Sequence, residues 1–244
     1  EGLTMPVKVL TAPGDTAGKN LLKNGNNYNT VHDATAATNA GNADTKFTLN
    51  AKAGSNYFIR RGILLYDFRA ENVQIPQNIK IIRAQIILND ASVNAPQTNG
   101  DKIRVGWVSN PNTFGQFSAN DYNKARYRAN HYTSAQVVAN GADNKVIELD
   151  NKLLLKRLEL AITGRTWLHL VIRNELDYLD TTATGNNRVW FDRPNADNNP
   201  LQLRFFYRTN NSRKNAGSGA GSASVNGFGG DSISAGTLSG FGFF

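Results

Sequence analysis

The stretch IKIIRAQIIL, Ile79–Leu88, decides the fold, because its side chains alternate as in a β-strand with one buried face. One face collects only apolar side chains, namely Ile82, Ala84, Ile86 and Leu88. The opposite face mixes polar and apolar ones, namely Ile81, Arg83, Gln85 and Ile87. We therefore predict a strand whose Ile82, Ile86 and Leu88 side chains are buried against a second sheet.

Similar strands are expected on both sides of this stretch. Apolar side chains share a face in residues 57–68, 102–108, 167–172, 189–191 and 201–207, and polar turn clusters separate these segments. One helix is expected between Asp150, its predicted N-cap, and Gly164, which can end it. Its apolar contacts would come from Leu153, Leu154, Leu158 and Ile162. The fold class predicted is all-β: a jelly-roll-like antiparallel β-sandwich with one short helix.

Composition divides the chain into three parts. Residues 1–56 are rich in Asn, Ala and Thr, contain strand-like segments at Met5–Leu10 and around Phe47, and are expected to form an extended N-terminal arm. Residues 57–208 are expected to form the sandwich core. Residues 209–244 form a tail whose last 28 residues hold nine Gly and six Ser. Such tracts behave as flexible spacers, so the predicted assembly anchors are the tail's phenylalanines, Phe228, Phe241, Phe243 and Phe244.

Composition and charge exclude several classes of protein. The chain has no cysteine, which excludes disulfides and thiolate metal sites. Its 32 asparagines favour turns over helix. The net charge of +8 is spread thinly, which disfavours nucleic-acid binding, and no apolar run is long enough to span a membrane. The first residue is Glu1, which predicts a cut by a signal peptidase or maturation protease and hence an extracellular, cell-surface or virion location; a shortened chain is the alternative.

The residue types needed for catalysis do not form a known pattern. The three histidines, His32, His131 and His169, lie far apart and lack metal-ligand spacing, so a zinc site and a Ser-His-Asp triad have little support. A glycosidase needs two carboxylates at a set separation. Glu148, Glu159 and Glu175 are the acids considered, but the sequence does not pair them. We therefore predict that the chain is not an enzyme and holds no catalytic cofactor.

Two kinds of binding site remain open. Calcium accepts oxygen ligands from loops, and two clusters offer them: Glu175, Asp177 and Asp180, or Asp192, Asn195 and Asp197. Surface turns stabilised by Asp and Asn side chains explain both clusters equally well. For glycan contact the candidates are three tyrosines in a loop rich in Asn and Arg, Tyr122, Tyr127 and Tyr132.

Four segments of the core carry a family resemblance. They are RRGILLYDF (residues 60–68), IPQNIKIIRAQIILN (residues 75–89), residues 146–175 with a capped helix and a returning strand, and residues 189–207, which contain WFDRPNADNNPLQLRFFY. Residues 57–208 thus resemble the DNRLRE family of surface and carbohydrate-associated β-sandwich modules. The order Tyr66-Asp67-Phe68 departs from the family's usual arrangement, and neither the arm nor the tail has a counterpart. The resemblance implies a jelly-roll-like sandwich and a role in adhesion, glycan contact or a surface layer, and it implies no chemistry.

Two functions follow as hypotheses. The leading one is a non-enzymatic structural subunit of an extracellular or virion assembly, such as a fibre, coat or decoration, which associates with copies of itself through arm and tail. The alternative is a carbohydrate-binding or adhesion module on a cell or virion surface.

Overall fold

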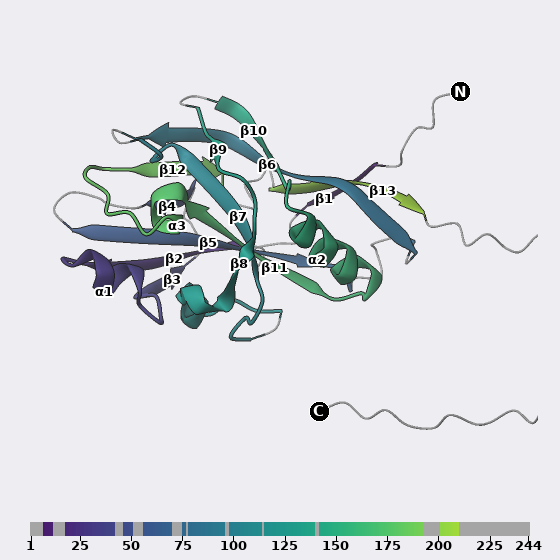
Figure 1. Cartoon of the computed structure of the whole chain (residues 1–244), viewed down its shortest axis with the longest axis horizontal. Coiled ribbons are helices and arrows are strands. Elements are labelled where there is room, and N and C mark those ends of the chain that lie inside the picture. The colour runs from purple at the N-terminus through teal and green to yellow at the C-terminus, as the bar shows by residue number, and fades with distance from the viewer. Residues whose placement is uncertain are drawn as a thin grey trace, which may run out of the picture. The chain divides into compact units, whose positions relative to one another are not determined.

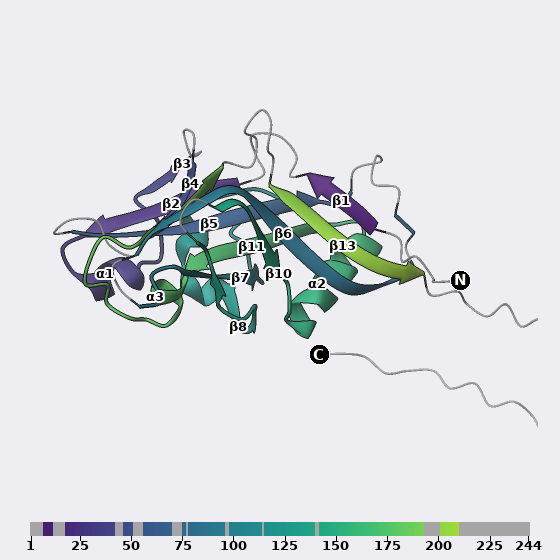
Figure 2. The ribbon, with the colours of Figure 1, turned by 90° about the horizontal axis from the view of Figure 1, so that it is seen from above.

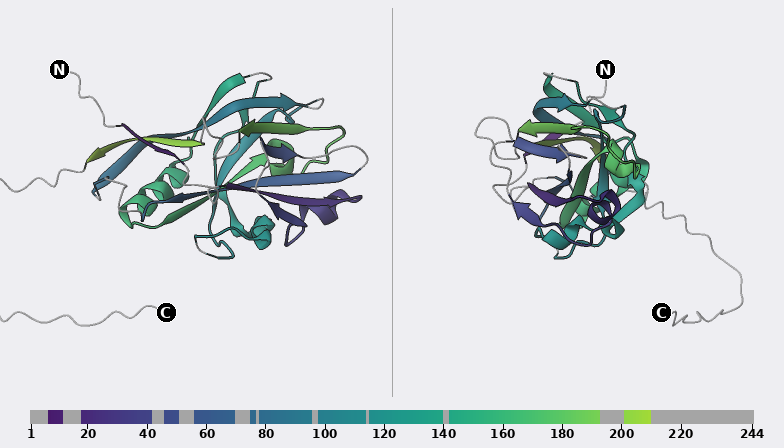
Figure 3. Two further views of the ribbon diagram at one scale, coloured as in Figure 1. Left: turned by 180° about the vertical axis from the view of Figure 1, so that it is seen from behind. Right: turned by 90° about the vertical axis from the view of Figure 1, so that its left-hand side faces the viewer.

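The computed structural model describes residues 7–11, 18–41, 46–50, 56–69, 75–76, 78–95, 98–113, 115–139, 142–192 and 201–209. The chain divides into two units, Glu1–Asn210 and Asn211–Phe244. The tail phenylalanines and the Asn195 and Asp197 pair of the second calcium cluster lie outside the described residues. Within the first unit two antiparallel sheets face each other (Figures 1 and 3), which confirms the predicted all-β sandwich.

The first sheet is built around the long strand β6 (Ile79–Asn94). It runs in the order β1 (Val7–Thr11), β13 (Gln202–Thr209), β6, β12 (Arg188–Asp192) and β4 (Lys46–Asn50), and β10 (Ala142–Glu148) also pairs with β6. Figure 2 shows β13 and β6 side by side, with β1 at the edge. The strand chosen from the sequence is thus the centre of its sheet.

The second sheet is built around β5 (Tyr57–Asp67) and β11 (Trp167–Asn174). It runs in the order β3 (Asn39–Gly41), β2 (Gly18–Gly25), β5, β11, β7 (Lys102–Val108) and β8 (Tyr127–Tyr132), and β9 (Gln136–Val137) also pairs with β7. Among the described residues three α-helices accompany the sheets: α1 (Tyr28–His32), α2 (Lys152–Thr163) and α3 (Glu175–Tyr178). Two 3-10 turns, η1 (Ala119–Tyr122) and η2 (Lys124–Arg126), precede β8.

The described part of residues 1–56 does not form an arm outside the sandwich. Strand β2 pairs along its whole length with β5, β4 pairs with β12, and β1 pairs with β13. The prediction of an extended arm is therefore wrong for these residues, which form strands of both sheets. The prediction of an arm relied on the low hydrophobicity of residues 1–56. Strands near a sheet edge need few apolar side chains of their own, so low hydrophobicity does not exclude them from a sheet.

The main core lies between the two sheets. The side chains of β6 contribute to it, but the pairing of β6 with β13 is irregular. Ile86 and Leu88 are fully buried as predicted, but Ile82 is 42% exposed and Ile81 is buried instead. The pairing of β6 with β13 shifts between Phe206 and Tyr207, so Ile82 is the extra residue of a β-bulge. A bulge reverses the side-chain alternation, because two residues on one strand oppose one on the other.

Helix α2 closes one end of the core between β6 and β11 (Figure 1). Leu154, Leu158 and Ile162 are buried and Gly164 caps the C-terminus, as predicted. Two details differ from the prediction. Asn151, not Asp150, is the N-cap, since its side chain accepts from the amides of residues 153 and 154, and Leu153 is exposed.

A second apolar cluster lies on the outer face of the second sheet. Leu21, Ile59, Ile63 and Val171 point outward from their strands and are buried beneath α1 and the η1 segment. The second sheet is therefore covered on both faces, which is why β5 and β11 read as nearly continuous apolar runs instead of alternating ones.

Candidate functional site

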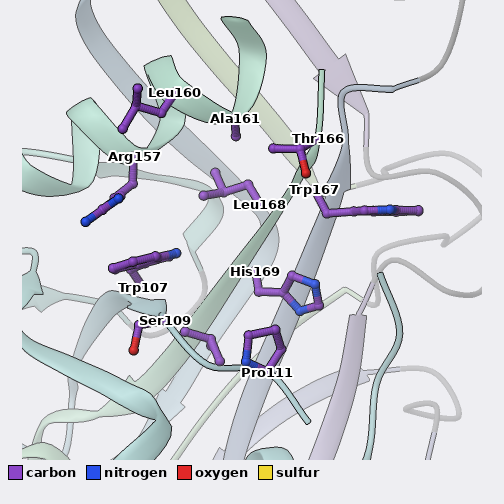
Figure 4. A pocket seen from close by; sticks show the side chains of 11 residues that line it. Trp107, Ser109, Pro111, Arg157, Leu160, Ala161, Thr166, Trp167, Leu168 and His169 are labelled. Atoms are coloured by element: carbon purple, nitrogen blue, oxygen red, sulfur yellow. The ribbon is translucent and has the colours of Figure 1, made fainter. Parts of the chain in front are cut away.

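A pocket opens where β7 and β11 meet α2, and it encloses about 180 Å³ (Figure 4). Its walls come from three places: the end of β7 and the following turn, one face of α2, and the start of β11. The lining residues are Trp107, Val108, Ser109, Pro111, Arg157, Leu160, Ala161, Thr166, Trp167, Leu168 and His169. Indole rings, a guanidinium group and a hydroxyl group therefore meet in one recess, the mix that small-ligand sites use.

Trp107 and Arg157 form one wall of the pocket. The guanidinium carbon of Arg157 lies 4.1 Å from the centre of the indole ring, a cation–π distance, and Figure 4 shows the two groups stacked. The His131 ring also packs on Trp107, with ring centres 5.1 Å apart. Among the described residues, no carboxylate forms a salt bridge with Arg157. Its charge therefore remains available to a ligand.

Trp167 forms the opposite wall and is held in place by two neighbours. The Arg69 guanidinium lies 4.3 Å from the indole centre and is anchored by two hydrogen bonds to Asp67. Gly115 has a φ of +75°, and a β-carbon there would lie 2.7 Å from the indole nitrogen. Glycine at this position therefore allows the backbone to approach the ring.

His169 lies at the base of the pocket, and its ring nitrogen Nε2 accepts a hydrogen bond of 3.0 Å from the Gly115 amide. Burial lowers the pKa of His169 to about 4, because the charged imidazolium loses its hydration. At neutral pH the ring is therefore uncharged, and Arg157 is the cation of the pocket.

A buried ion network lies elsewhere, on the outer face of the second sheet. Asp177 accepts hydrogen bonds from Arg61 on β5, at 2.7 and 2.9 Å, and from Arg173 on β11 at 2.6 Å. Arg61 and Asp177 are fully buried. Arg61 also donates to the backbone carbonyls of Tyr122 and His32, so one side chain connects the sheet to η1 and α1.

The three tyrosines predicted to contact glycans belong to this network, and that prediction is wrong. Tyr122, Tyr127 and Tyr132 are 0, 8 and 6% exposed. Tyr122 and Tyr127 donate to backbone carbonyls, and Tyr132 accepts from Arg173. The polar segment around them suggested a surface loop, but their rings pack over the apolar outer face of the sheet.

The calcium cluster predicted from Glu175, Asp177 and Asp180 is also not formed. Glu175 binds Arg104 through two hydrogen bonds, at 2.5 and 2.9 Å. Asp177 is engaged by the two arginines. Only Asp180 is exposed, and it meets a different group of residues, His32 and Asp33. Arginine partners occupy the oxygens that calcium would need.

The acids considered for hydrolysis are also paired. Glu148 pairs with Arg83 and Gln85, and the hydrogen bond from Arg83 contributes most to the lowered pKa of Glu148. Glu159 accepts from Lys156 and from the Ile81 amide, and these bonds outweigh burial, so its pKa is also lowered. A general acid needs a raised pKa, so this arrangement opposes that role for both residues.

Sequence reasoning missed the pocket and the network. Trp107 is partly buried against the main core and also lines the pocket, near the end of β7. The sequence feature that could have indicated the pocket is the pair Trp107 and Trp167, because each stands beside a predicted turn. Nothing in the sequence placed Arg157 against Trp107, because that contact depends on how α2 packs.

Comparison with known proteins leaves the family open. No family model matches the chain, and no curated protein matches it. The resemblance to DNRLRE modules therefore stays a prediction. Within the described part of the chain, no helix has the length and apolar character needed to cross a membrane.

Proposed function

We propose that the chain is a non-enzymatic structural subunit of an extracellular or virion assembly, joined to copies of itself through its tail. The observation that carries this proposal is the edge of the first sheet. Strand β1 pairs with β13 on one side and, among the described residues, has no strand on the other. The tail follows β13 directly in the sequence.

An edge strand of this kind is a template for a further strand. Its outward amide and carbonyl groups gain backbone hydrogen bonds when a segment from a neighbouring subunit adds to the sheet. The tail has the composition for such a role, since Gly and Ser allow close approach and phenylalanines supply anchors. Each buried phenylalanine contributes about 1.5–3 kcal/mol. All described members of the main core and the second apolar cluster belong to the first unit, Glu1–Asn210.

Deleting residues 217–244 tests this proposal. We expect a folded, soluble monomer with near-normal melting that no longer assembles, as seen by negative-stain imaging and analytical ultracentrifugation. Replacing Phe228, Phe241, Phe243 and Phe244 with serine should have the same effect. The matched control replaces Ser218, Ser222, Ser224 and Ser232 with alanine and should still assemble. Assembly of the truncated chain, or its outright unfolding, would show that the tail is not the connector.

The pocket favours a second candidate function, carbohydrate binding. Sugar rings have apolar faces that pack on indoles and hydroxyl groups that bond to side chains such as Arg157 and Ser109. The pocket offers both kinds of group in one recess. This role is compatible with the first, because the pocket is lined by β7, β11 and α2, whereas the proposed assembly edge is β1.

Replacing Trp107 with alanine tests this second function. We expect the intact protein to bind at least one glycan in a polysaccharide panel, measured by intrinsic fluorescence or NMR titration. Trp107→Ala and Arg157→Ala should each weaken that binding about tenfold or more, the loss expected for a central aromatic or arginine contact. Trp190→Ala is the matched control, since this partly buried tryptophan lies on β12 and does not line the pocket. Absence of binding, or equal binding by all variants, would remove the pocket from consideration.

A further inference from the structure

Three side chains meet where the end of α1 approaches the segment after α3. His32 is the last residue of α1, Asp33 is its C-cap, and Asp180 follows α3 by two residues. One ligand-type atom from each lies within 4.8 Å of the others. The His32 side chain is 2% exposed, whereas the side chains of the two aspartates are more than half exposed.

Both ring nitrogens of His32 face acceptor oxygens. Nε2 lies 2.9 Å from the backbone carbonyl oxygen of Asp177, which can only accept a hydrogen bond. With Nε2 as the donor to this carbonyl, Nδ1 is the nitrogen that can bind a cation. The ring is also held by Tyr28, with ring centres 5.2 Å apart and planes 15° from parallel. This outer bond to a carbonyl is the arrangement that orients metal-binding histidines.

The other nitrogen, Nδ1, then points its lone pair at negative charge. It lies 2.7 Å from a carboxylate oxygen of Asp33 and 3.1 Å from one of Asp180. A neutral imidazole cannot donate to both oxygens from a nitrogen that has no proton. This contact needs a cation, which is a proton on Nδ1, the Lys124 ammonium or an ion bound by all three groups.

Lys124 is the positive charge nearest to this cluster. Its ammonium nitrogen lies 2.5 Å from Asp33 and 3.4 Å from Nδ1 of His32. Lys124 is 41% exposed and sits on a flexible stem, so it can leave the cluster when a stronger cation arrives.

We propose that His32, Asp33 and Asp180 form a binding site for a divalent transition-metal ion of the zinc class. One imidazole nitrogen and two carboxylate oxygens are ligands that such ions share, whereas calcium and magnesium prefer oxygen alone. Exposed carboxylates leave the remaining coordination positions to water.

The ion would link two segments that are far apart in the sequence. His32 and Asp33 belong to the N-terminal part of the chain, and Asp180 lies about 150 residues later. Both segments cover the outer face of the second sheet, above the Arg61, Arg173 and Asp177 network. Metal binding would therefore hold this cover in place in a chain that has no cysteine for a disulfide.

Isothermal titration calorimetry of the untagged full chain with zinc chloride tests the proposal. We expect one zinc ion per chain and no binding of calcium chloride. Asp33→Asn and Asp180→Asn, both at exposed side chains, should each weaken zinc binding about tenfold or more. Lys124→Met should strengthen it, because the competing ammonium is gone. Asp101→Asn is the matched control for loss of one acidic charge and should bind as the parent does.

A spectroscopic readout identifies the ligand nitrogen. With only three histidines in the chain, the side-chain nitrogen NMR signals can be assigned individually, and zinc should shift Nδ1 of His32 and leave His131 and His169 unchanged. The proposal fails if no zinc binds, or if the Asp33 and Asp180 variants keep the parental affinity. It also fails if Lys124→Met weakens binding, since the lysine would then support the cluster and not compete for it.

Discussion

Replacing Asp177 with asparagine is expected to lower the free energy of unfolding by about 3–5 kcal/mol, the loss found when one partner of a buried ion pair is removed. The change leaves Arg61 and Arg173 buried without a counter-charge, at 0 and 5% exposure. It also weakens the contacts that hold α1 and η1 to the second sheet. Chemical denaturation followed by circular dichroism measures the effect.

Glu148→Gln is the matched control for Asp177→Asn. Glu148 pairs with Arg83 at the surface, where both side chains are more than a third exposed. Such pairs contribute about 0–1 kcal/mol, because water already solvates both charges. If the two substitutions prove equally costly, or if Asp177→Asn costs under about 1 kcal/mol, the buried network does not support the fold as described.

The same network should make the stability of the protein depend on pH, and the direction of that dependence follows from the pKa of Asp177. Burial alone would raise the pKa of Asp177, but attraction from Arg173 and Arg61 and their hydrogen bonds outweigh it and hold the pKa well below its usual range. In the unfolded chain an aspartate titrates near about 3.9. The stabilisation is therefore complete above about pH 4 and decreases as the pH falls further. Asp177→Asn should flatten this acid limb of the stability curve.

Replacing Ile86 with alanine is expected to lower the free energy of unfolding by about 2–5 kcal/mol. Ile86 is 0% exposed and lies on β6 between β13 and β10, facing the main core. Truncation removes buried methyl groups and leaves a cavity that the surrounding strands cannot fill. Urea denaturation of the full chain is the measurement.

Ile82→Ala is the matched control on the same strand. Because Ile82 is 42% exposed at the bulge, its truncation should cost under about 1 kcal/mol. The structure and the simple alternation rule disagree at this residue, so the pair of variants decides between them. A large loss at Ile82 together with a small loss at Ile86 would show that β6 has a different register.

Much of the fold follows from local sequence patterns. The alternation in residues 102–108 and 201–207 identifies the buried faces, and Ile103, Val105, Leu203 and Phe205 are buried as their spacing predicts. Gly164 ends α2 as its position suggests. These features are readable because they depend on periodicity and on backbone preference, which act within a few residues.

The sequence failed where a contact joins distant parts of the chain. It put Tyr122, Tyr127 and Tyr132 at the surface because they stand among Asn and Arg, and it offered Asp177 as either a calcium ligand or a surface-turn residue. Arg61 and Arg173 reach Asp177 only after β5 and β11 pair as neighbours. The sequence does not show whether a charged side chain on a strand pairs with a residue from another segment or is hydrated by solvent.

The sequence by itself determined the all-β class, the helix α2 and most of the core faces, because backbone preference and side-chain alternation are local properties. Only the tertiary structure decided the bulge at Ile82, the place of β2, β3 and β4 in the two sheets, the pocket at Trp107 and the His32, Asp33 and Asp180 cluster. Each of these depends on strand pairing between segments many residues apart. Pairing partners are selected by the packing of the whole domain, which no short stretch of sequence contains.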